Sequence, residues 1–183
     1  MKPQILLDNT LFNLVLNRLC YELIEQHDDF ENTVLIGIQP RGVFFARQII
    51  NRLKEIAPKS NLEYGELDIT FYRDDFRRRE GGHLMANMTK IDFLIEGKKV
   101  VLVDDVLFTG RTIRSAFDAL LAFGRPETIE LLVLIERRFS KQVPVDAFYI
   151  GKSIDSIASQ RVLVKWLENG APDKVILHNS DND

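Results

Sequence analysis

Residues 100–103 form an unbroken apolar run, and two acidic residues and the pattern of a helix start follow it directly. Such a run is typical of a strand that is buried on both faces, as in a parallel sheet. Parallel strands need crossover connections, which are usually helices and almost always right-handed. The run therefore predicts an α/β fold with this strand inside the sheet, where ligands bind at the carboxyl ends of the strands.

The rest of the chain alternates between helix and strand patterns. Periodic apolar residues predict helices at residues 11–24 and 43–56, and a third helix opens at Thr109-Gly110. Short apolar runs predict strands at residues 34–38, 62–72, 100–103, 129–135, 147–150 and 161–167. Residues 73–90 are polar and predict a long loop. This alternation predicts a mostly parallel sheet flanked by helices.

Length and charge narrow the class of protein. The chain has 183 residues, and no repeat or linker divides it, so we expect a single domain over residues 1–183. It shows no signal-peptide pattern and no apolar run near the roughly 20 residues of a membrane span, so we expect a cytoplasmic protein without membrane contact. A net charge of −3 excludes a uniformly basic nucleic-acid binder and leaves only a local basic patch for that role.

The acidic residues after the apolar run are Asp104 and Asp105. The strand fixes their position, and two adjacent carboxylates can accept hydrogen bonds from a sugar diol or from the water shell of Mg²⁺. An acidic pair after a strand has little specificity on its own. The hypothesis requires that the pair stands at the rim of a cleft rather than in a packed interior.

Thr109, Gly110, Arg111 and Thr112 follow at a helix start. Unpaired backbone N–H groups and the helix dipole favour a phosphate there, although Thr and Gly at a helix start are more often an ordinary cap. The order of apolar strand, acid pair and this turn is far more specific than any part alone. The pattern lacks the Gly-Lys-Ser/Thr of a Walker A loop and the Gly-x-Gly-x-x-Gly of a Rossmann fingerprint. It favours a phosphorylated sugar as ligand.

Residues 100–112 resemble the 5-phosphoribosyl-1-pyrophosphate (PRPP) motif of the type I phosphoribosyltransferases. Together with YRDD at residues 72–75, Gly-Arg-Pro at 124–126 and Tyr-Ile-Gly-Lys at 149–152, they resemble the PyrR family of pyrimidine operon attenuators that double as uracil phosphoribosyltransferases. The resemblance spans about residues 7–152. It implies a type I phosphoribosyltransferase fold, with a parallel five-stranded sheet, a small hood and a flexible loop, and the reaction of uracil with PRPP to UMP and diphosphate.

The resemblance also assigns roles to matched positions. Asp104 and Asp105 would hold the ribose hydroxyls, with Mg²⁺ as cofactor held through sugar or water, and together with Arg41 they would be the catalytic residues. The PRPP-binding residues would be Pro40, Arg41, Gly42, Asp104, Asp105, Val106, Leu107, Phe108, Thr109, Gly110, Arg111 and Thr112.

Residues 39–42 resemble the pyrophosphate loop of the family, in which a non-proline peptide bond is often cis. This implies a cis bond between Pro40 and Arg41, which would cost about 3 to 4 kcal/mol and is a kind of strain found at ligand clamps. A proline-containing turn in trans is the alternative.

Residues 73–88 resemble the flexible loop that closes over bound substrate, with Arg73, Arg77, Arg78 and Arg79 as its basic residues. The last three are open to three interpretations: a pyrophosphate clamp, part of an RNA-binding patch, or a solvated face. Phe108 stands where purine-specific relatives have an acidic residue, which favours a pyrimidine base.

The family resemblance implies PRPP and uracil or UMP as ligands, an mRNA leader as a further partner, and a homo-oligomer, either dimer or tetramer. Residues 136–146 depart from the family pattern because they lack its Gly and His. This difference affects the expectation of uracil as the base and the expectation of RNA binding. Two alternatives stay open: a nucleotide-binding attenuator with vestigial catalysis, and a phosphoribosyltransferase for another base.

Overall fold

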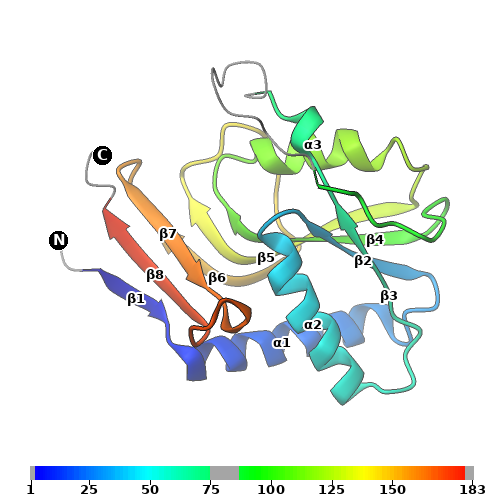
Figure 1. The fold of residues 1–183 in the computed structure, drawn as a ribbon, viewed down its shortest axis with the longest axis horizontal. Coiled ribbons are helices and arrows are strands. Elements are labelled where there is room, and N and C mark those ends of the chain that lie inside the picture. The colour runs from blue at the N-terminus through cyan, green and yellow to red at the C-terminus, as the bar shows by residue number, and fades with distance from the viewer. Residues whose placement is uncertain (1–2, 75–86, 180–183) are drawn as a thin grey trace.

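The computed structural model describes residues 3–74 and 87–179. Its larger sheet has five parallel strands in the order β3-β2-β4-β5-β6. The strands are β2 (Thr33–Ile38), β3 (Glu63–Leu67), β4 (Lys99–Leu107), β5 (Thr128–Arg138) and β6 (Tyr149–Asp155). Figure 1 shows α1 (Asn9–His27) and α2 (Gly42–Ile56) on one face of this sheet and α3 (Arg111–Leu120) on the other. The predicted parallel α/β sheet flanked by helices is confirmed.

The apolar run in β4 is buried on both faces, as its composition predicts. Val101 and Val103 pack into the core with α1 and α2, whereas Val100 and Leu102 pack into the core with α3. Alternate side chains of a strand point to opposite faces, so a central strand between two helix layers needs apolar residues at every position. This burial fixes the strand that carries the acid pair.

A second sheet forms the small hood. It is antiparallel, with the order β1-β8-β7, and consists of β1 (Gln4–Leu7), β7 (Gln160–Lys165) and β8 (Lys174–Asn179), with the short 3₁₀ helix η2 (Leu167–Asn169) between the last two. Both described chain ends lie at this sheet (Figure 1). Trp166 joins it to the helices, because its ring lies 6.0 Å from those of Phe12 and Phe44 and 6.2 Å from that of Phe45.

Several predicted boundaries were wrong. The strand predicted at 62–72 ends at Leu67, because Asp68 Oδ1 accepts a hydrogen bond from Thr70 N at 3.0 Å and the chain turns into a 3₁₀ helix, η1 (Thr70–Tyr72). β4 does not end before the acid pair but continues to Leu107, which is in register with Glu136 of β5. The last predicted strand ends at Lys165, and neither β1 nor β8 was predicted.

Helices in the described part of the chain are all too short or too polar to cross a membrane. Arg77, Arg78 and Arg79, and most of the predicted loop, lie outside the described residues.

Candidate active site

Asp104 and Asp105 lie on β4 near its carboxyl end and are only 6% and 5% exposed. The sequence hypothesis required that the pair face a cleft rather than a packed interior. Both residues are nearly buried, yet they form part of the lining of a cavity of about 510 Å³. Its lining comes from β4, β5, α3, the hood strand β7, the turn between β2 and α2, and loop residues: Gln39, Pro40, Arg41, Ile69, Arg73, Asp104, Asp105, Val106, Phe108, Thr112, Arg137, Ala158, Gln160, Arg161 and Val162.

The acid pair is poorly compensated. Asp104 Oδ1 accepts a hydrogen bond from Asp105 N at 2.9 Å, but Asp105 Oδ2 is buried and has no hydrogen-bond partner among the described residues. The nearest cation is Arg41, whose Nε lies 3.8 Å from that oxygen. Burial raises the pKa of both carboxyl groups, the Asp105 charge raises the pKa of Asp104 further, and Arg41 opposes these effects. The pair therefore favours a ligand that supplies hydroxyl donors or a cation.

The turn of residues 39–42 joins β2 to α2 and approaches the acid pair closely. A Cβ on Gly42 would lie 2.3 Å from the carbonyl oxygen of Val103 and 3.2 Å from Asp104 Oδ1, so glycine alone fits there. The cis peptide bond is Gln39–Pro40 rather than the expected Pro40–Arg41. The tertiary amide before proline tolerates the cis form far better than other peptide bonds do, which accounts for the difference.

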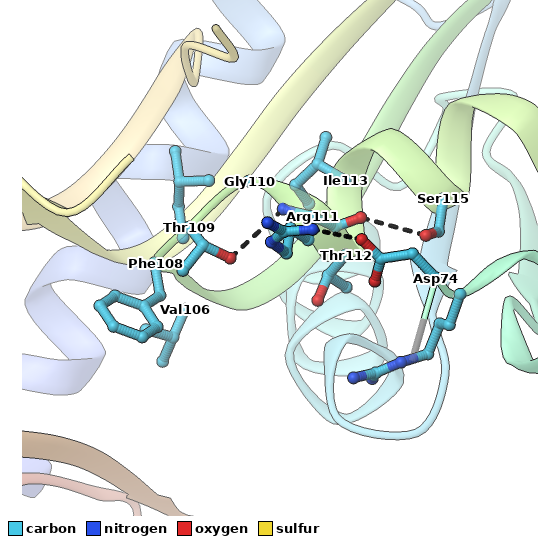
Figure 2. A pocket seen from close by; sticks show the side chains of 11 residues that line it. Asp74, Val106, Phe108, Thr109, Gly110, Arg111, Thr112, Ile113 and Ser115 are labelled. Atoms are coloured by element: carbon cyan, nitrogen blue, oxygen red, sulfur yellow. Dashed lines mark hydrogen bonds and ion pairs between the residues drawn. The ribbon is translucent and has the colours of Figure 1, made fainter. Parts of the chain in front are cut away.

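Thr109, Gly110, Arg111 and Thr112 form the start of α3 and face a second cavity of about 610 Å³ (Figure 2). Gly110 has φ +83° and sits at the N-cap, a backbone conformation that favours glycine. Gln142 N and Val143 N fix the turn by donating to the Thr109 carbonyl at 2.9 and 3.1 Å. The cavity is lined by Arg73, Asp74, Val106, Leu107, Phe108, Thr109, Gly110, Arg111, Thr112, Ile113 and Ser115. A helix start open to a cavity is suited to an anion.

Arg111 is already engaged in this structure. Its Nη1 contacts Asp74 Oδ2 (Figure 2), and its Nε donates to Gln142 Oε1 at 2.7 Å. Gly110 is buried, whereas its neighbours Arg111 and Phe108 are exposed. The turn is therefore open toward the cavity. The turn predicted from sequence is thus in place.

Phe108 connects the two cavities to a third of about 600 Å³, which lies between residues 139–142 and 155–160. The guanidinium of Arg137 lies 3.8 Å from the centre of the Phe108 ring. Arg137 also donates to Ser156 Oγ at 2.7 Å and to the Ile157 carbonyl at 2.9 Å. A flat apolar ring backed by a fixed cation can hold a planar base.

Sequence reasoning included Gln39 in the pyrophosphate loop but gave it no role, and it did not assign Arg137 or the hood residues of this site. Arg137 had a usable signal, because it follows the apolar part of β5 at the carboxyl edge of the sheet, where ligands bind. No local sequence signal pointed to the hood residues Gln160, Arg161 and Val162. Strand pairing within the hood brings them near the acid pair. Val106, Phe108, Thr112 and Arg73 line both the acid-pair cavity and the phosphate-turn cavity.

Comparison with known proteins agrees with this geometry. A family model described as the phosphoribosyl transferase domain matches residues 4–169. A relative from Elusimicrobium minutum named "Bifunctional protein PyrR" is 40% identical over 176 residues, which cover 96% of this chain and 97% of that protein. A Geobacter relative of the same name is 42% identical over 173 residues, which cover 94% of this chain and 96% of that protein.

Solved structures show the same fold at lower identity. A hypoxanthine phosphoribosyltransferase from Staphylococcus aureus superimposes with a TM-score of 0.65 at 21% identity, covering 84% of this chain and 79% of that one. A hypoxanthine phosphoribosyl transferase from Trypanosoma cruzi gives a TM-score of 0.68 at 17% identity, covering 96% and 91%. At these identities the likeness concerns the fold.

Proposed function

Because the chain belongs to the phosphoribosyltransferase family and, within it, to the PyrR proteins, we propose that it transfers the phosphoribosyl group of PRPP to uracil, which yields UMP and diphosphate. One observation carries the proposal. The acid-pair cavity and the phosphate-turn cavity adjoin along Val106, Phe108 and Thr112, so a sugar in one and its phosphate in the other would form a single ligand.

The residue roles follow from this placement. Asp104 and Asp105 would accept hydrogen bonds from the two ribose hydroxyls, which would give Asp105 Oδ2 the partner it lacks. The α3 turn from Thr109 to Thr112 would hold the 5-phosphate through backbone N–H groups and hydroxyls. Arg41, exposed beside the acid pair, would neutralise the diphosphate.

Mg²⁺ fits the acid pair only as a partly hydrated ion. The described residues contain no cluster of three or more His, Cys, Asp or Glu side chains that would form a protein cage. An ion held through one or two carboxylates, water and substrate oxygens is the usual arrangement for Mg²⁺, and the unpaired Asp105 Oδ2 suits it. When bound, the ion would neutralise charge on the diphosphate leaving group.

Transfer forms the bond from uracil N1 to ribose C1 while the bond from C1 to the diphosphate oxygen breaks and its electron pair leaves with the diphosphate; the N1 proton is released to the diphosphate or to water. Positive charge develops on the sugar in this step, so the buried carboxylates can stabilise it electrostatically. Water competes with uracil for the sugar, so the chain must hold the base and exclude solvent. Phe108, backed by Arg137, would supply that wall for a pyrimidine ring.

Diphosphate release with PRPP and a panel of bases tests the proposal. We expect turnover with uracil and none with hypoxanthine or guanine. Turnover with a purine alone would instead support transfer to another base. Tight UMP binding without turnover of any base would support the attenuator with vestigial catalysis and contradict the enzyme.

A second function, regulation through an mRNA leader, is favoured by the word "bifunctional" in the names of relatives that cover almost the whole chain. We propose that UMP controls the binding of this RNA. We also propose that the protein acts as a homo-oligomer in the cytoplasm. A mobility shift with leader RNA, measured with and without UMP and over a salt series, tests it. Replacement of Arg77, Arg78 and Arg79 together separates the interpretations of that run, because an unchanged shift would exclude it as the RNA patch.

A further inference from the structure

The turn of residues 39–42, which we assign to diphosphate, is held at its first residue by an anchored side chain. Gln39 is buried, its backbone N donates to the Leu67 carbonyl at 2.9 Å, and its side-chain Nε2 donates to the Met88 carbonyl at 2.9 Å. Both contacts fix the residue that directly precedes Pro40 and Arg41. The acceptor of the side-chain bond belongs to a segment far away in the sequence.

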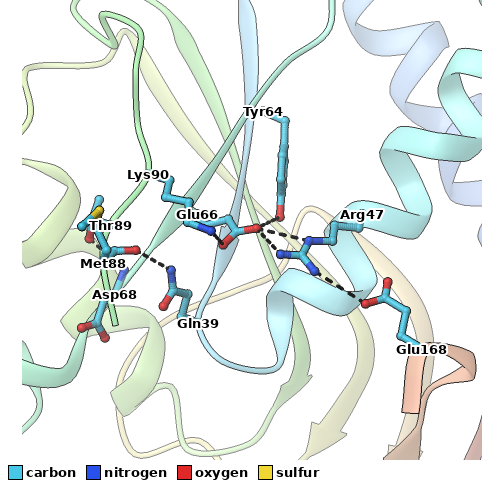
Figure 3. A network of polar contacts seen from close by, with 9 residues as sticks. All are labelled: Gln39, Arg47, Tyr64, Glu66, Asp68, Met88, Thr89, Lys90 and Glu168. Carbon is cyan, nitrogen blue, oxygen red and sulfur yellow. Dashed lines mark hydrogen bonds and ion pairs between the residues drawn. The ribbon is translucent and has the colours of Figure 1, made fainter. Parts of the chain in front are cut away.

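That segment is itself fastened to β3. Lys90 N donates to the Glu66 carbonyl at 2.8 Å, and Glu66 N donates to the Lys90 carbonyl at 2.9 Å. Asp68 N donates to Thr89 Oγ1 at 3.0 Å. Residues 88–90 therefore form a fixed platform for the amide of Gln39 (Figure 3).

The same strand holds the other flank of the turn. Arg47, on the helix that begins at Gly42, donates from Nη2 and Nε to Glu66 Oε1 at 2.6 and 3.2 Å. Lys90 Nζ lies 3.5 Å from Glu66 Oε2, and Tyr64 donates to Oε1 at 3.3 Å. Glu66 is only 8% exposed, so these cations satisfy a charge that burial would otherwise penalise.

These contacts close a ring around the turn. The chain runs from Gln39 through the turn to Arg47, and contacts lead from Arg47 to Glu66, from there to residues 88–90, and back to Gln39 (Figure 3). We infer that Gln39 and Arg47 are positioning residues for the diphosphate end of PRPP, because they hold both flanks of the 39–42 turn against one platform. The inference rests on the proposed function of that turn.

The position of the 39–42 turn matters because there is no free space between the turn and the strand that carries the acid pair. A Cβ on Gly42 would already collide with the backbone of Val103 and Asp104, and Arg41 lies near Asp105, so a small shift of the turn changes both approaches. A misplacement of about 1 Å can cost on the order of a hundredfold in an active site. The phosphate turn of α3 lies outside this ring. A shift of the 39–42 turn should therefore leave the phosphate turn in place.

Gln39→Met, which keeps the side-chain length but removes the donor, tests the inference. We expect the Kd for inorganic diphosphate and the KM for PRPP to rise about tenfold, while the Kd for UMP, which has no diphosphate, changes less than about twofold. Gln48→Met is the matched control, because Gln48 lies on α2 away from the turn and its Nε2 makes a similar bond, donating to Asp173 Oδ1 at 2.9 Å. The control should lose a similar amount of thermal stability and keep its diphosphate affinity.

A second test uses Arg47→Met, at the other flank of the turn, with Arg52→Met as its control. This test also keeps the inference falsifiable if Gln39→Met does not fold. Arg52, on the far part of α2, contacts Glu55 of the same helix and Asn17 of α1. We expect weaker diphosphate binding for Arg47→Met only, with partial recovery in Arg47→Lys. In the double variant of Gln39 and Arg47, the ring predicts a loss smaller than the product of the single losses.

The outcomes separate this inference from the proposed function. Diphosphate and UMP affinities that fall together, or a Gln39→Met variant with wild-type diphosphate affinity, would overturn the inference while leaving the function of the turn intact. A wild-type protein that binds UMP but not diphosphate would overturn the function of the turn, and the positioning role with it.

Discussion

Two buried polar clusters lie at opposite ends of the same parallel sheet. At the amino end, His27 Nε2 lies 2.9 Å from the Tyr149 hydroxyl and 3.1 Å from Glu130 Oε2, and its Nδ1 lies 3.1 Å from Thr33 Oγ1. Tyr149 also donates to Glu130 at 2.8 Å. At the carboxyl end, Asp105 Oδ2 has no hydrogen-bond partner among the residues the structure describes.

The difference separates a structural cluster from a functional one. Leaving a buried polar group unpaired costs about 1 to 3 kcal/mol, so a fold tolerates it only where something else completes it. The amino-end cluster is complete without a ligand. The acid pair is not, and it lines a cavity with Arg41 and the 39–42 turn. Changes at the two ends should therefore affect different properties of the protein.

The largest effect is expected for Asp104→Asn combined with Asp105→Asn. These changes replace one acceptor oxygen of each carboxylate with an amide donor and remove the negative charge proposed to stabilise the charged sugar, so kcat/KM for PRPP should fall about a thousandfold. The free energy of unfolding should stay equal or rise, because two poorly compensated buried charges are removed. Diphosphate release and thermal unfolding measure both. A rate within tenfold of wild type would remove the assigned role.

Gly42→Ala comes next. Its Cβ would lie 2.3 Å from the Val103 carbonyl, so α2 must shift away from β4. We expect about a hundredfold loss in kcat/KM and a loss of about 1 to 3 kcal/mol in unfolding free energy. Gly97→Ala is the control, since nothing lies within 4 Å of its Cβ position; its φ of +70°, which Gly42 does not share, makes this change cost stability through the backbone alone. Equal activity losses in both variants would contradict a steric effect at the site.

At the amino end, Tyr149→Phe should act on stability alone. It removes the hydroxyl that contacts both His27 and Glu130, which should cost about 1 to 2 kcal/mol in unfolding free energy. The kcat/KM should stay within about twofold, because the site lies at the other end of the sheet. Denaturant unfolding and steady-state kinetics check this. A stable but inactive variant would show that the two ends are coupled.

The smallest effect concerns pH. Burial lowers the pKa of His27, Glu130 opposes this in part, and Lys99 adds to the lowering. Below about pH 6.5 the His27 side chain is protonated in the unfolded chain but stays neutral in the folded chain. The free energy of unfolding should therefore fall as pH drops from about 7.5 to 5.5. The slope from this group cannot exceed about 1.4 kcal/mol per pH unit. His27→Gln should flatten the dependence of the melting temperature on pH, and an unchanged slope would exclude His27 as its source.

The sequence predicted the parts of this molecule that local patterns encode. The apolar run of β4 identified a central strand because burial on both faces demands apolar residues at every position. The acid pair and the turn at Gly110 could be predicted because they follow that strand directly. The extent of β4 could not, since pairing with β5, as at Leu107 and Glu136, keeps the polar residues in the strand.

Contacts distant in sequence escaped prediction. The hood brings β1, at the start of the chain, against β8 near its end, and four-residue strands such as Gln4–Leu7 carry little periodicity. The ring around the 39–42 turn joins Gln39 to Met88 and Arg47 to Glu66, and no local pattern links those pairs. The contact of Arg137 with Phe108 depends likewise on two neighbouring strands.

A calorimetric titration of PRPP, with and without Mg²⁺, tests most directly whether the acid pair and the phosphate turn hold one ligand. We expect the wild-type protein to bind PRPP at one site per chain and to bind it more tightly with Mg²⁺. The Asp104→Asn and Asp105→Asn double variant should bind weakly and without dependence on the ion. Equal PRPP affinity and equal Mg²⁺ dependence in the two proteins would contradict the account.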